Sequence, residues 1–405
     1  MKIYISGYGT ISSLGNSPQE IFDSLINNES GSRYMTEWDR YKQFNCRVGS
    51  PARYYDPKIL PRIARRSMSK AGEMASIAIL QALEMAQLKV EDFSEEKSLF
   101  IVGATKGNGE AAEEFFDHMR ASDHLYTYCN SFLKYMNHSV AANSALVASF
   151  NGSVISTSAA CATSAQSIIL GWELLQTGLY DIAICGGADE LDPSTNMVFD
   201  NAYAASTKYN DLPKNTPRPF DRDRDGVVVS EGGGIVILET EERLKKRNGK
   251  ALAEVVSGAY FREGSHLTQN SSESIIHTMK MSLKRAGLTA NDIEYINAHA
   301  TGTVHGDQQE VEAIRTLFDS KTPVSSLKGY FGHSISACGA LEIIATIEMM
   351  KKGILIGTRN LENISEDCKG IDHIQKNRAQ KVDLAMSNNF AFGGINTSII
   401  VRNLL

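Results

Sequence analysis

Hydrophobic and polar positions along the chain predict short strands that alternate with longer helices. Strand-like patterns occupy residues 2–6, 98–103 and 181–187, and helix-like patterns occupy residues 17–26 and 62–88. The strand at 181–187 is apolar almost throughout, which is typical of a strand buried on both faces. Strands and helices in this alternation predict an α/β fold.

The second half of the chain repeats the plan of the first. A strand expected at 253–256 corresponds to the one at 3–6, and a strand at 293–297 corresponds to the one at 98–103. Neither half could close a core alone, so stacking the two would bury a common core. The seam is expected at the end of the charged run 241–250. This predicts an N-terminal half at residues 1–250 and a C-terminal half at residues 251–405.

Glycine-rich stretches are expected to bend the chain. Gly7-Tyr8-Gly9 is expected to end the first strand in a turn. It resembles the start of a dinucleotide-binding fingerprint, but it lacks the third glycine and a suitably placed acidic residue, so we reject nucleotide binding. Hairpins are expected at 227–240, bent at 232–234, and at 385–401, bent at 393–394.

A single thiol, Cys161, stands among small residues in the stretch 154–165, which opens as a strand. A helical pattern follows at 166–178, so the thiol is expected near a helix N-terminus, where free N–H groups and the helix dipole favour a thiolate. Small neighbours would let a substrate reach the sulfur. An inert buried cysteine explains this stretch equally well.

Composition narrows the classes of function. The net charge of −6 gives no general attraction for nucleic acid or an anionic membrane. No apolar run approaches the roughly 18 residues of a membrane helix, and the N-terminus reads as a strand rather than a signal peptide. The cysteines form no CxxC pair, which predicts reduced thiols and a cytoplasmic protein. Residues 221–226 imitate a calcium loop, but Gly232 stands where the closing glutamate belongs, so no metal site is predicted.

Three further stretches rich in small residues, 297–303, 328–333 and 388–396, each end a strand or open a helix. The duplication makes the loop of His333 the mate of the cysteine loop and brings His299 to the same face. One thiol and two neutral histidines suit acyl transfer followed by carbon–carbon bond formation, with the imidazoles donating hydrogen bonds to an enolate oxygen. A single histidine is more often a hydrogen-bonded structural residue than a catalytic one. Two histidines in loops of small residues at strand ends favour a catalytic role for both.

Together these stretches resemble an elongating β-ketoacyl-[acyl-carrier-protein] synthase of type I or II, a condensing enzyme of the thiolase superfamily. The resemblance extends over essentially all 405 residues. It implies a thiolase-like fold of duplicated β-α halves, layered α-β-α-β-α. It also implies decarboxylative condensation of an acyl chain, held as a cysteine thioester, with malonyl-acyl-carrier protein in fatty acid or polyene/polyketide biosynthesis. The motifs that carry it are 158–165, 205–211, 218–221, 224–226 and 390–396.

The resemblance implies a role for each matching residue. Cys161 would be the acylated nucleophile, and the backbone N–H groups of Cys161 and Phe392 would form its oxyanion hole. His299 and His333 would promote decarboxylation of the malonyl group and stabilise the enolate. No cofactor is implied beyond the phosphopantetheine arm that carries the substrates.

Other residues would support these groups. Lys328 would act on the histidines electrostatically, and Glu310 would belong to the buried polar network behind them. Phe392 and Phe390 would gate malonyl entry, and two threonines would hold the pantetheine arm. The residues expected to bind substrate are Thr301, Thr303, Lys106, Met197 and Phe199.

Three positions depart from the family pattern. Ala300 and Ala391 stand where relatives usually have glycine, so each adds a methyl group near substrate or in the gating turn. Lys106 stands in a loop that is nearly all small residues in relatives. We hypothesise an altered acyl-chain preference, towards a specialised polyene or polyketide product. Profiling with a panel of acyl-carriers tests this, and ordinary saturated elongation at full rate would contradict it.

The expected partner is an acidic acyl carrier protein, which a net negative chain must attract locally. Cationic residues at helical spacing would form a stripe at the rim of the cleft, although they also suit a solvated helix face. The resemblance implies a homodimer, with a heterodimer containing a sister subunit as the alternative. The residues of the stripe are Arg62, Arg65, Arg66 and Lys70.

Three alternatives remain at this point. A non-elongating, chain-length-factor-like partner subunit would lose the nucleophile, which is present here. A thiolase would use a second cysteine, and Cys338 follows His333 closely, but its loop lacks the thiolase context. A cysteine hydrolase has no use for two histidines.

Overall fold

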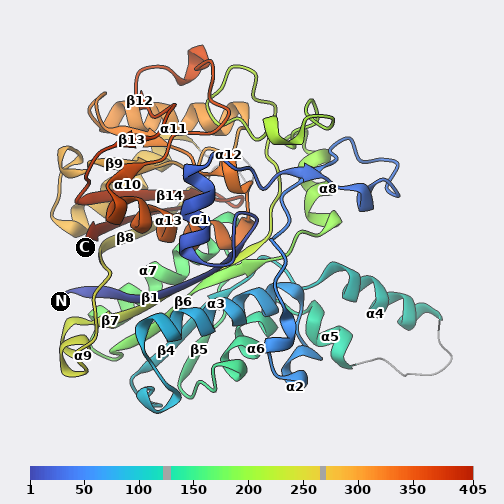
Figure 1. Ribbon diagram of the computed structural model, residues 1–405, viewed down its shortest axis with the longest axis vertical. Helices are drawn as coiled ribbons and strands as arrows, with labels where there is room; N and C mark the ends of the chain where they lie inside the picture. Colours follow the sequence, from blue (N-terminus) through green and yellow to red (C-terminus); the bar gives the residue numbers. More distant parts are fainter. Residues whose placement is uncertain (122–128, 265–270, 405) are drawn as a thin grey trace.

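The computed structural model describes residues 1–121, 129–264 and 271–404, and an 11-stranded mixed sheet runs through it (Figure 1). The strand order is β12-β10-β9-β14-β15-β8-β1-β7-β6-β4-β5. Strands from the first part of the chain occupy one end, namely β1 (Ile3–Ser12), β4 (Ser98–Gly103), β5 (Ser153–Ile155), β6 (Ile182–Asp189) and β7 (Gly232–Thr240). The others are β8 (Ala253–Arg262), β9 (Tyr295–Asn297), β10 (Pro323–Ser325), β12 (Asp372–His373), β14 (Leu384–Phe390) and β15 (Ile395–Asn403).

The two groups of strands have the same internal pairing. In the first, β1–β7 and β7–β6 are antiparallel, and β6–β4 and β4–β5 are parallel. In the second, β8–β15 and β15–β14 are antiparallel, and β14–β9 and β9–β10 are parallel. The groups join where β1 pairs with β8 through Tyr4–Glu254 and Ile5–Ala253. The duplication predicted from the sequence is therefore confirmed.

Helices cover both outer faces of the sheet and fill the space between its two groups of strands (Figure 1). α7 and α13 pack together and contact strands of both groups, α3 and α6 cover the first group, and α10 covers the second with α11 beside it. The result is the predicted α-β-α-β-α layering. The helices are α1 (Pro18–Ile26), α2 (Arg62–Arg65), α3 (Lys70–Ala86), α4 (Gly109–Ala121), α5 (Cys129–Tyr135), α6 (Ser139–Val147), α7 (Thr163–Gln176), α8 (Pro193–Asn201), α9 (Glu241–Lys246), α10 (Ser272–Ala286), α11 (Val304–Leu317), α12 (Lys328–Phe331) and α13 (Cys338–Lys352).

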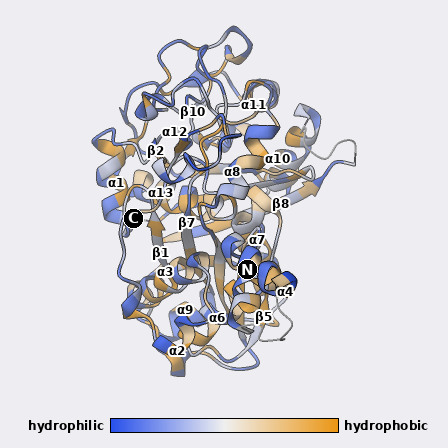
Figure 2. Ribbon diagram, turned by 90° about the vertical axis from the view of Figure 1, so that its right-hand side faces the viewer, coloured by the Kyte–Doolittle hydropathy of each residue, from blue (hydrophilic) through white to orange (hydrophobic). Residues whose placement is uncertain are grey.

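The largest buried cluster lies between the two groups of strands. Ile168 and Ile169 of α7 meet Leu341 and Ile344 of α13 there, and all four are fully or almost fully buried. In the side view of Figure 2 the outer loops are mostly hydrophilic, whereas apolar residues concentrate in the strands and the helices that cover them. α13 is buried from Cys338 to Met350, and α7 is buried along the face that meets it and at its first three residues, so close packing fixes the N-termini of both helices.

Two of the predicted glycine bends are wrong, for one physical reason. β1 continues through residues 7–9, with a shift of its register against β7 between Ile5 and Gly7, and β7 runs through 232–234. A Cβ on Gly7 would lie 2.3 Å from the carbonyl oxygen of Ala82, and one on Gly234 would lie 2.9 Å from Cβ of Ala340. These glycines let helices approach the sheet closely. The third predicted bend is right, because β14 and β15 form a hairpin.

The helix predicted over residues 62–88 is also wrong as a single element. It divides into α2 and α3, because the hydroxyl of Ser69 accepts the N–H of Gly72 and starts a new helix there. Two small antiparallel sheets complete the fold. They pair β2 (Arg33–Tyr34) with β3 (Val48–Gly49), and β11 (Ile354–Leu355) with β13 (Arg378–Ala379).

Candidate active site

Cys161 lies in a short 3₁₀ turn, η4 (Ala160–Ala162), that leads directly into α7. Ala160 has a φ of +45°, a value that residues other than glycine rarely adopt. The hydroxyl of Thr163 holds this turn, since it accepts the N–H of Ala159 at 2.8 Å and donates to the carbonyl of Ala160 at 2.8 Å. The position of the thiol is therefore set by the backbone and by buried hydrogen bonds.

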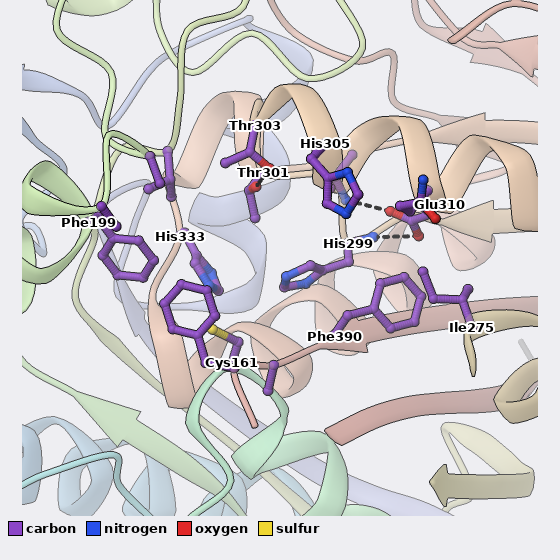
Figure 3. A pocket seen from close by; sticks show the side chains of 18 of the residues that line it. Cys161, Phe199, Ile275, His299, Thr301, Thr303, His305, Glu310, His333 and Phe390 are labelled. Atoms are coloured by element: carbon purple, nitrogen blue, oxygen red, sulfur yellow. Dashed lines mark hydrogen bonds between the residues drawn. The ribbon is translucent and has the colours of Figure 1, made fainter. Parts of the chain in front are cut away.

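Two histidines from the second group of strands meet this thiol (Figure 3). His333 follows α12, and its Nε2 lies 2.9 Å from Sγ of Cys161. His299 follows β9, and its ring centroid lies 5.2 Å from that of His333, with the planes at 86°. The structure thus brings the three predicted groups into contact range from three separate loops.

The three side chains open into one cavity of about 380 Å³. Phe390 forms one wall, and its ring centroid lies 5.6 Å from that of His299. The ring centroids of Phe392 and Phe199 are 5.4 Å apart. The hydroxyls of Thr301 and Thr303 are 3.1 Å apart on the opposite wall. The remaining lining residues are Val198, Ala202, Ala204, Val227, Ile275, Ala300, His305, Gly306, Gln309, Glu310 and Ala391.

A buried ion pair lies behind the histidines. The ammonium group of Lys328 contacts the carboxylate of Glu342, and both side chains are almost fully buried. Burial opposes the charge on Lys328, but Glu342 outweighs it and raises the pKa of the ammonium group. Burial, and then the Lys328 charge, lower the pKa of His299 and of His333 well below the usual value. Both imidazoles are therefore neutral at pH 7 and can donate hydrogen bonds.

The thiol itself is protonated at rest. Burial raises the pKa of Cys161 to about 12, while the Lys328 charge and the backbone N–H groups of Cys161 and Phe392 act in the opposite direction. Loss of solvent thus opposes the thiolate that a helix N-terminus favours. Nε2 of His333 is the adjacent base that can take the proton.

Glu310 fixes the loop that carries His299. Its carboxylate accepts the backbone N–H of His299 at 2.9 Å and of Ala300 at 2.7 Å (Figure 3). Burial raises the pKa of Glu310 to about 8, even though these N–H groups favour the charged form. Asp307, one turn earlier, accepts the N–H of Gly302 at 3.1 Å. The loop is thus held by two acidic side chains of α11.

Two residues predicted to bind substrate do not reach this cavity. Lys106 instead pairs with Asp192 at 2.9 Å and donates to Ser194 at 2.5 Å, beside a separate hollow. Met197 is 41% exposed and does not line the cavity, whereas Phe199, two residues later in α8, does. A helix turns its residues by about 100° each, so neighbours in sequence face different sides.

The predicted cationic stripe does not border the cavity of this chain either. α2 lies at the lower end of the molecule in Figures 1 and 2, away from α8. Arg62 and Arg66 are exposed there, and Arg65 donates to the carbonyl of Leu60 at 3.3 Å. Lys70 contacts the buried carboxylate of Glu231. None of the four residues lines the cavity, because α2 and α3 are separate helices and the chain between them is not helical. The role of these residues in binding a carrier stays a prediction.

Sequence reasoning missed two members of the network behind the histidines. Glu342 pairs with Lys328, and Asn389 donates to Glu342 at 2.8 Å. Glu342 did leave a signal, since it is an acidic residue within the apolar stretch 338–347. Asn389 left none that separates it from Asn388 beside it.

Neither a metal site nor a membrane span emerges from the described ranges. Within residues 1–121, 129–264 and 271–404, no three His, Cys, Asp or Glu side chains are placed to hold a metal ion. No helix in these ranges combines the length and apolar character needed to cross a membrane.

Known proteins with similar sequence or structure share this architecture. The family model for the N-terminal domain of beta-ketoacyl synthases matches residues 1–243, and the model for the C-terminal domain matches residues 252–362. The chain is 32% identical over 406 residues to 3-oxoacyl-[acyl-carrier-protein] synthase 1 of Escherichia coli K12, covering 100% of this chain and 99% of that protein. A beta-ketoacyl synthase from Burkholderia phymatum STM815 is 37% identical, with a TM-score of 0.96 over 100% of both chains. The ishigamide ketosynthase/chain length factor is 26% identical, with a TM-score of 0.92 over 100% of this chain and 99% of that one.

Proposed function

The chain belongs to the beta-ketoacyl synthase family, and from this premise we propose that it extends acyl chains by decarboxylative condensation with malonyl-acyl-carrier protein. The observation that carries the proposal is the 2.9 Å contact between Sγ of Cys161 and Nε2 of His333, with His299 beside them in one cavity. One nucleophile and two neutral hydrogen-bond donors serve the two half-reactions of such an acyltransferase.

In the first half-reaction the acyl group moves from its carrier to Cys161. The Sγ–H proton passes to Nε2 of His333 as the sulfur attacks the thioester carbonyl, and the carrier sulfur then leaves and takes that proton. The backbone N–H groups of Cys161 and Phe392, which both act on the sulfur, would hold the oxygen of the tetrahedral intermediate. His333 ends this step neutral with its hydrogen on Nδ1, and a shift of that hydrogen to Nε2 by exchange with water would restore the donor that the second step needs.

In the second half-reaction the malonyl group loses carbon dioxide. The electrons of the broken carbon–carbon bond form an enolate, whose oxygen would receive hydrogen bonds from His299 and His333. The enolate carbon attacks the acyl carbonyl, the bond from that carbon to Sγ breaks, and Cys161 leaves as a thiolate that takes up one proton from solvent. Lys328 keeps both rings neutral, since its positive charge opposes their protonation. The products are carbon dioxide and the β-ketoacyl-carrier protein.

The walls of the cavity suit a phosphopantetheine arm, which the substrates themselves supply. Thr301 and Thr303 would bind its amides through their hydroxyls, and Glu310 would keep the loop of His299 in place. Phe392 would act as the gate together with Phe390, because it follows β14 at a turn where Gly393 and Gly394 have φ values of +90° and +73°. Such glycines can change conformation where other residues cannot.

Acyl selection would depend on the apolar end of this cavity. Phe199 is the one predicted acyl contact that lines it, and Ala300 adds its methyl group nearby. Of the three departures from the family pattern, Ala300 and Ala391 line the cavity and Lys106 does not, so the product class that we propose is a fatty acid or a polyene/polyketide. The chain-length-factor alternative is disfavoured, because Cys161 is present and in contact with a base.

The carrier-binding proposal needs the dimer. Because Arg62 and Arg66 do not line the cavity of their own chain and α2 lies away from α8, an acidic carrier bound at these residues would serve the cavity of a second copy. Ile63 between them is 77% exposed, which adds an apolar contact for the carrier. Reversing the charge of Arg62 and Arg66 should raise the KM for the carrier in a salt-dependent way, and an unchanged KM would refute this role.

A homodimer would form through the end of the sheet that β5 leaves unpaired. Val154 in this edge strand is 47% exposed, and Phe132 and Leu133 of α5 are exposed beyond it. An apolar sheet edge of this kind is typical of a surface that pairs with another chain. A heterodimer with a sister subunit would use the same edge. The cytoplasmic location stays a prediction.

The deciding experiment is incubation of the purified protein with acyl- and malonyl-carrier proteins, followed by mass analysis of protein and product. We expect an acyl adduct on Cys161 and a β-ketoacyl-carrier product. Free acid would indicate a hydrolase, and the absence of both adduct and product would indicate a non-elongating partner. Cys161→Ala should abolish the adduct, whereas Cys185→Ala, a matched buried cysteine outside the cavity, should retain it.

A further inference from the structure

A second cysteine, Cys338, lies directly behind the nucleophile and has no part in the mechanism above. It is the first residue of α13 and is buried. Its sulfur lies 3.1 Å from the carbonyl oxygen of Cys161 and 3.4 Å from Nδ2 of Asn389. Cys338 does not line the cavity, so it contacts the nucleophile only through the backbone.

The direction of these two hydrogen bonds follows from chemistry. Burial raises the pKa of Cys338 well above its usual value, so the group remains a thiol. A carbonyl oxygen only accepts, and therefore the S–H of Cys338 donates to Cys161. The amide nitrogen of Asn389 donates to the sulfur in return. The thiol thus uses both its donor and its acceptor capacity.

The same asparagine connects this contact to the buried ion pair. Nδ2 of Asn389 carries two hydrogens, and its other partner is the carboxylate of Glu342 at 2.8 Å. Glu342 in turn pairs with Lys328. A continuous series of contacts therefore runs from Lys328 through Glu342, Asn389 and Cys338 to the backbone of Cys161.

We propose that Cys338 is a positioning residue for the nucleophile and its oxyanion hole, an inference that rests on the proposed function. Its thiol joins η4, which carries Cys161, to β14, which leads within two residues to Phe392. The two N–H groups assigned to the oxyanion hole come from these two segments. Cys338 therefore fixes their spacing, as a bridge between the cysteine turn and the gate hairpin.

The size of the effect follows from the bonds that would be lost. Removing the thiol leaves the carbonyl of Cys161 and one N–H of Asn389 without a partner inside the protein. Neutral hydrogen bonds of this kind change equilibria and rates by about 3- to 10-fold. The acyl transfer step should respond, because it needs both oxyanion donors, whereas malonyl decarboxylation depends on the two histidines.

The test compares Cys338→Ala and Cys338→Ser in the full-length enzyme, with Cys185→Ala as a buried control outside the cavity. We expect Cys338→Ala to slow single-turnover acylation of Cys161 by about 3- to 10-fold, with KM for the acyl-carrier and the rate of malonyl decarboxylation unchanged. Cys338→Ser should recover most of the rate, since a hydroxyl donates and accepts in the same place. Cys185→Ala should change neither half-reaction.

Two results would overturn the proposal. One is acylation at the wild-type rate in Cys338→Ala. The other is an equal fall in both half-reactions without recovery in Cys338→Ser, which would mean that Cys338 only packs. A wild-type protein that forms no acyl adduct would instead refute the proposed function. In that case the positioning role of Cys338 would be tested by alkylation of Cys161 with iodoacetamide, which needs no carrier. We expect alkylation to be slower in Cys338→Ala than in the wild type.

Discussion

The turns that open α7 and α13 have nearly the same backbone but carry different chemistry. Each begins with a residue other than glycine at positive φ, Ala160 at +45° and Ile335 at +48°, and each continues through a 3₁₀ turn into a central helix. The second residue of the first turn is Cys161, which lines the cavity. Its counterpart is Ser336, which is buried and does not line it. The second loop acts through His333, which precedes its turn.

This difference shows how a duplicated fold acquires an asymmetric site. The N-termini of α7 and α13 are equivalent in the two halves. The reacting group of the first, Cys161, lies inside its 3₁₀ turn, whereas that of the second, His333, lies two residues before its turn. Cys161 and His333 meet at 2.9 Å, whereas the position equivalent to Cys161 carries Ser336. His299 comes from the end of β9, and the centroid of its ring lies 5.2 Å from that of His333.

The histidines give the largest predicted effect, because only one of them touches the thiol. His333→Ala should slow both the acylation of Cys161 and malonyl decarboxylation, by about 10²- to 10⁴-fold in each. His299→Ala should slow decarboxylation by a similar factor and leave acylation nearly unchanged. Single-turnover acylation measured by mass, together with carbon dioxide release, separates the two half-reactions.

His277→Ala is the matched control, since His277 is exposed on α10, where its ring lies against Phe261. It should leave both half-reactions intact. Equal loss of acylation in His299→Ala and His333→Ala would show that the 2.9 Å contact does not set the division of labour.

The sequence was sufficient to predict the reacting groups, because they stand in small-residue loops at strand ends. It was insufficient for residues whose role depends on which way a side chain faces. The resemblance predicts Lys106 and Met197 at the cavity, yet Lys106 pairs with Asp192 and Met197 is 41% exposed. The same limit hid Asn389, which differs from Asn388 only by alternation along β14.

The glycines show a second limit. A glycine pair within an apolar run is equally consistent with a bend and with a helix crossing close above a strand. Gly7 and Gly234 belong to the second case, because carbonyl and Cβ atoms of α3 and α13 occupy the space of their missing side chains. That distinction depends on contacts between segments far apart in the chain, which local patterns do not contain.

The next largest effect is expected from removing the Lys328–Glu342 ion pair, which should change the pH dependence of condensation rather than its maximal rate. Lys328 lowers the pKa of both histidines, which must be neutral to act, so the acid limb of the condensation profile should lie below pH 6.5. The double variant Lys328→Met/Glu342→Gln removes the charge without leaving an unpaired carboxylate. The histidine pKa values should then rise, moving the acid limb to higher pH by roughly one unit.

Steady-state condensation rates measured across pH give this limb directly. The exposed pair of Lys245 with Glu241 on α9 provides the control, since its double variant should not move the limb. A limb that stays in place in the Lys328→Met/Glu342→Gln variant would mean that burial alone keeps the histidines neutral.

The smallest effect concerns the strained backbone that both turns share. A residue other than glycine in the left-handed region costs roughly 1 kcal/mol, so Ala160→Gly should relieve strain and offset the greater flexibility of glycine in the unfolded chain. Calorimetry should show a melting temperature equal to or slightly above that of the wild type. Ala162→Gly, in the same turn but at a φ of −99°, relieves no strain and should be destabilised by about 0.5–1 kcal/mol.

The strain would also serve the chemistry, because the rotation at Ala160 aims the N–H of Cys161 at the oxyanion. Acylation should therefore slow in Ala160→Gly despite its stability, and a variant both stable and fully active would show that the strained turn is a relic of the duplication rather than part of the site.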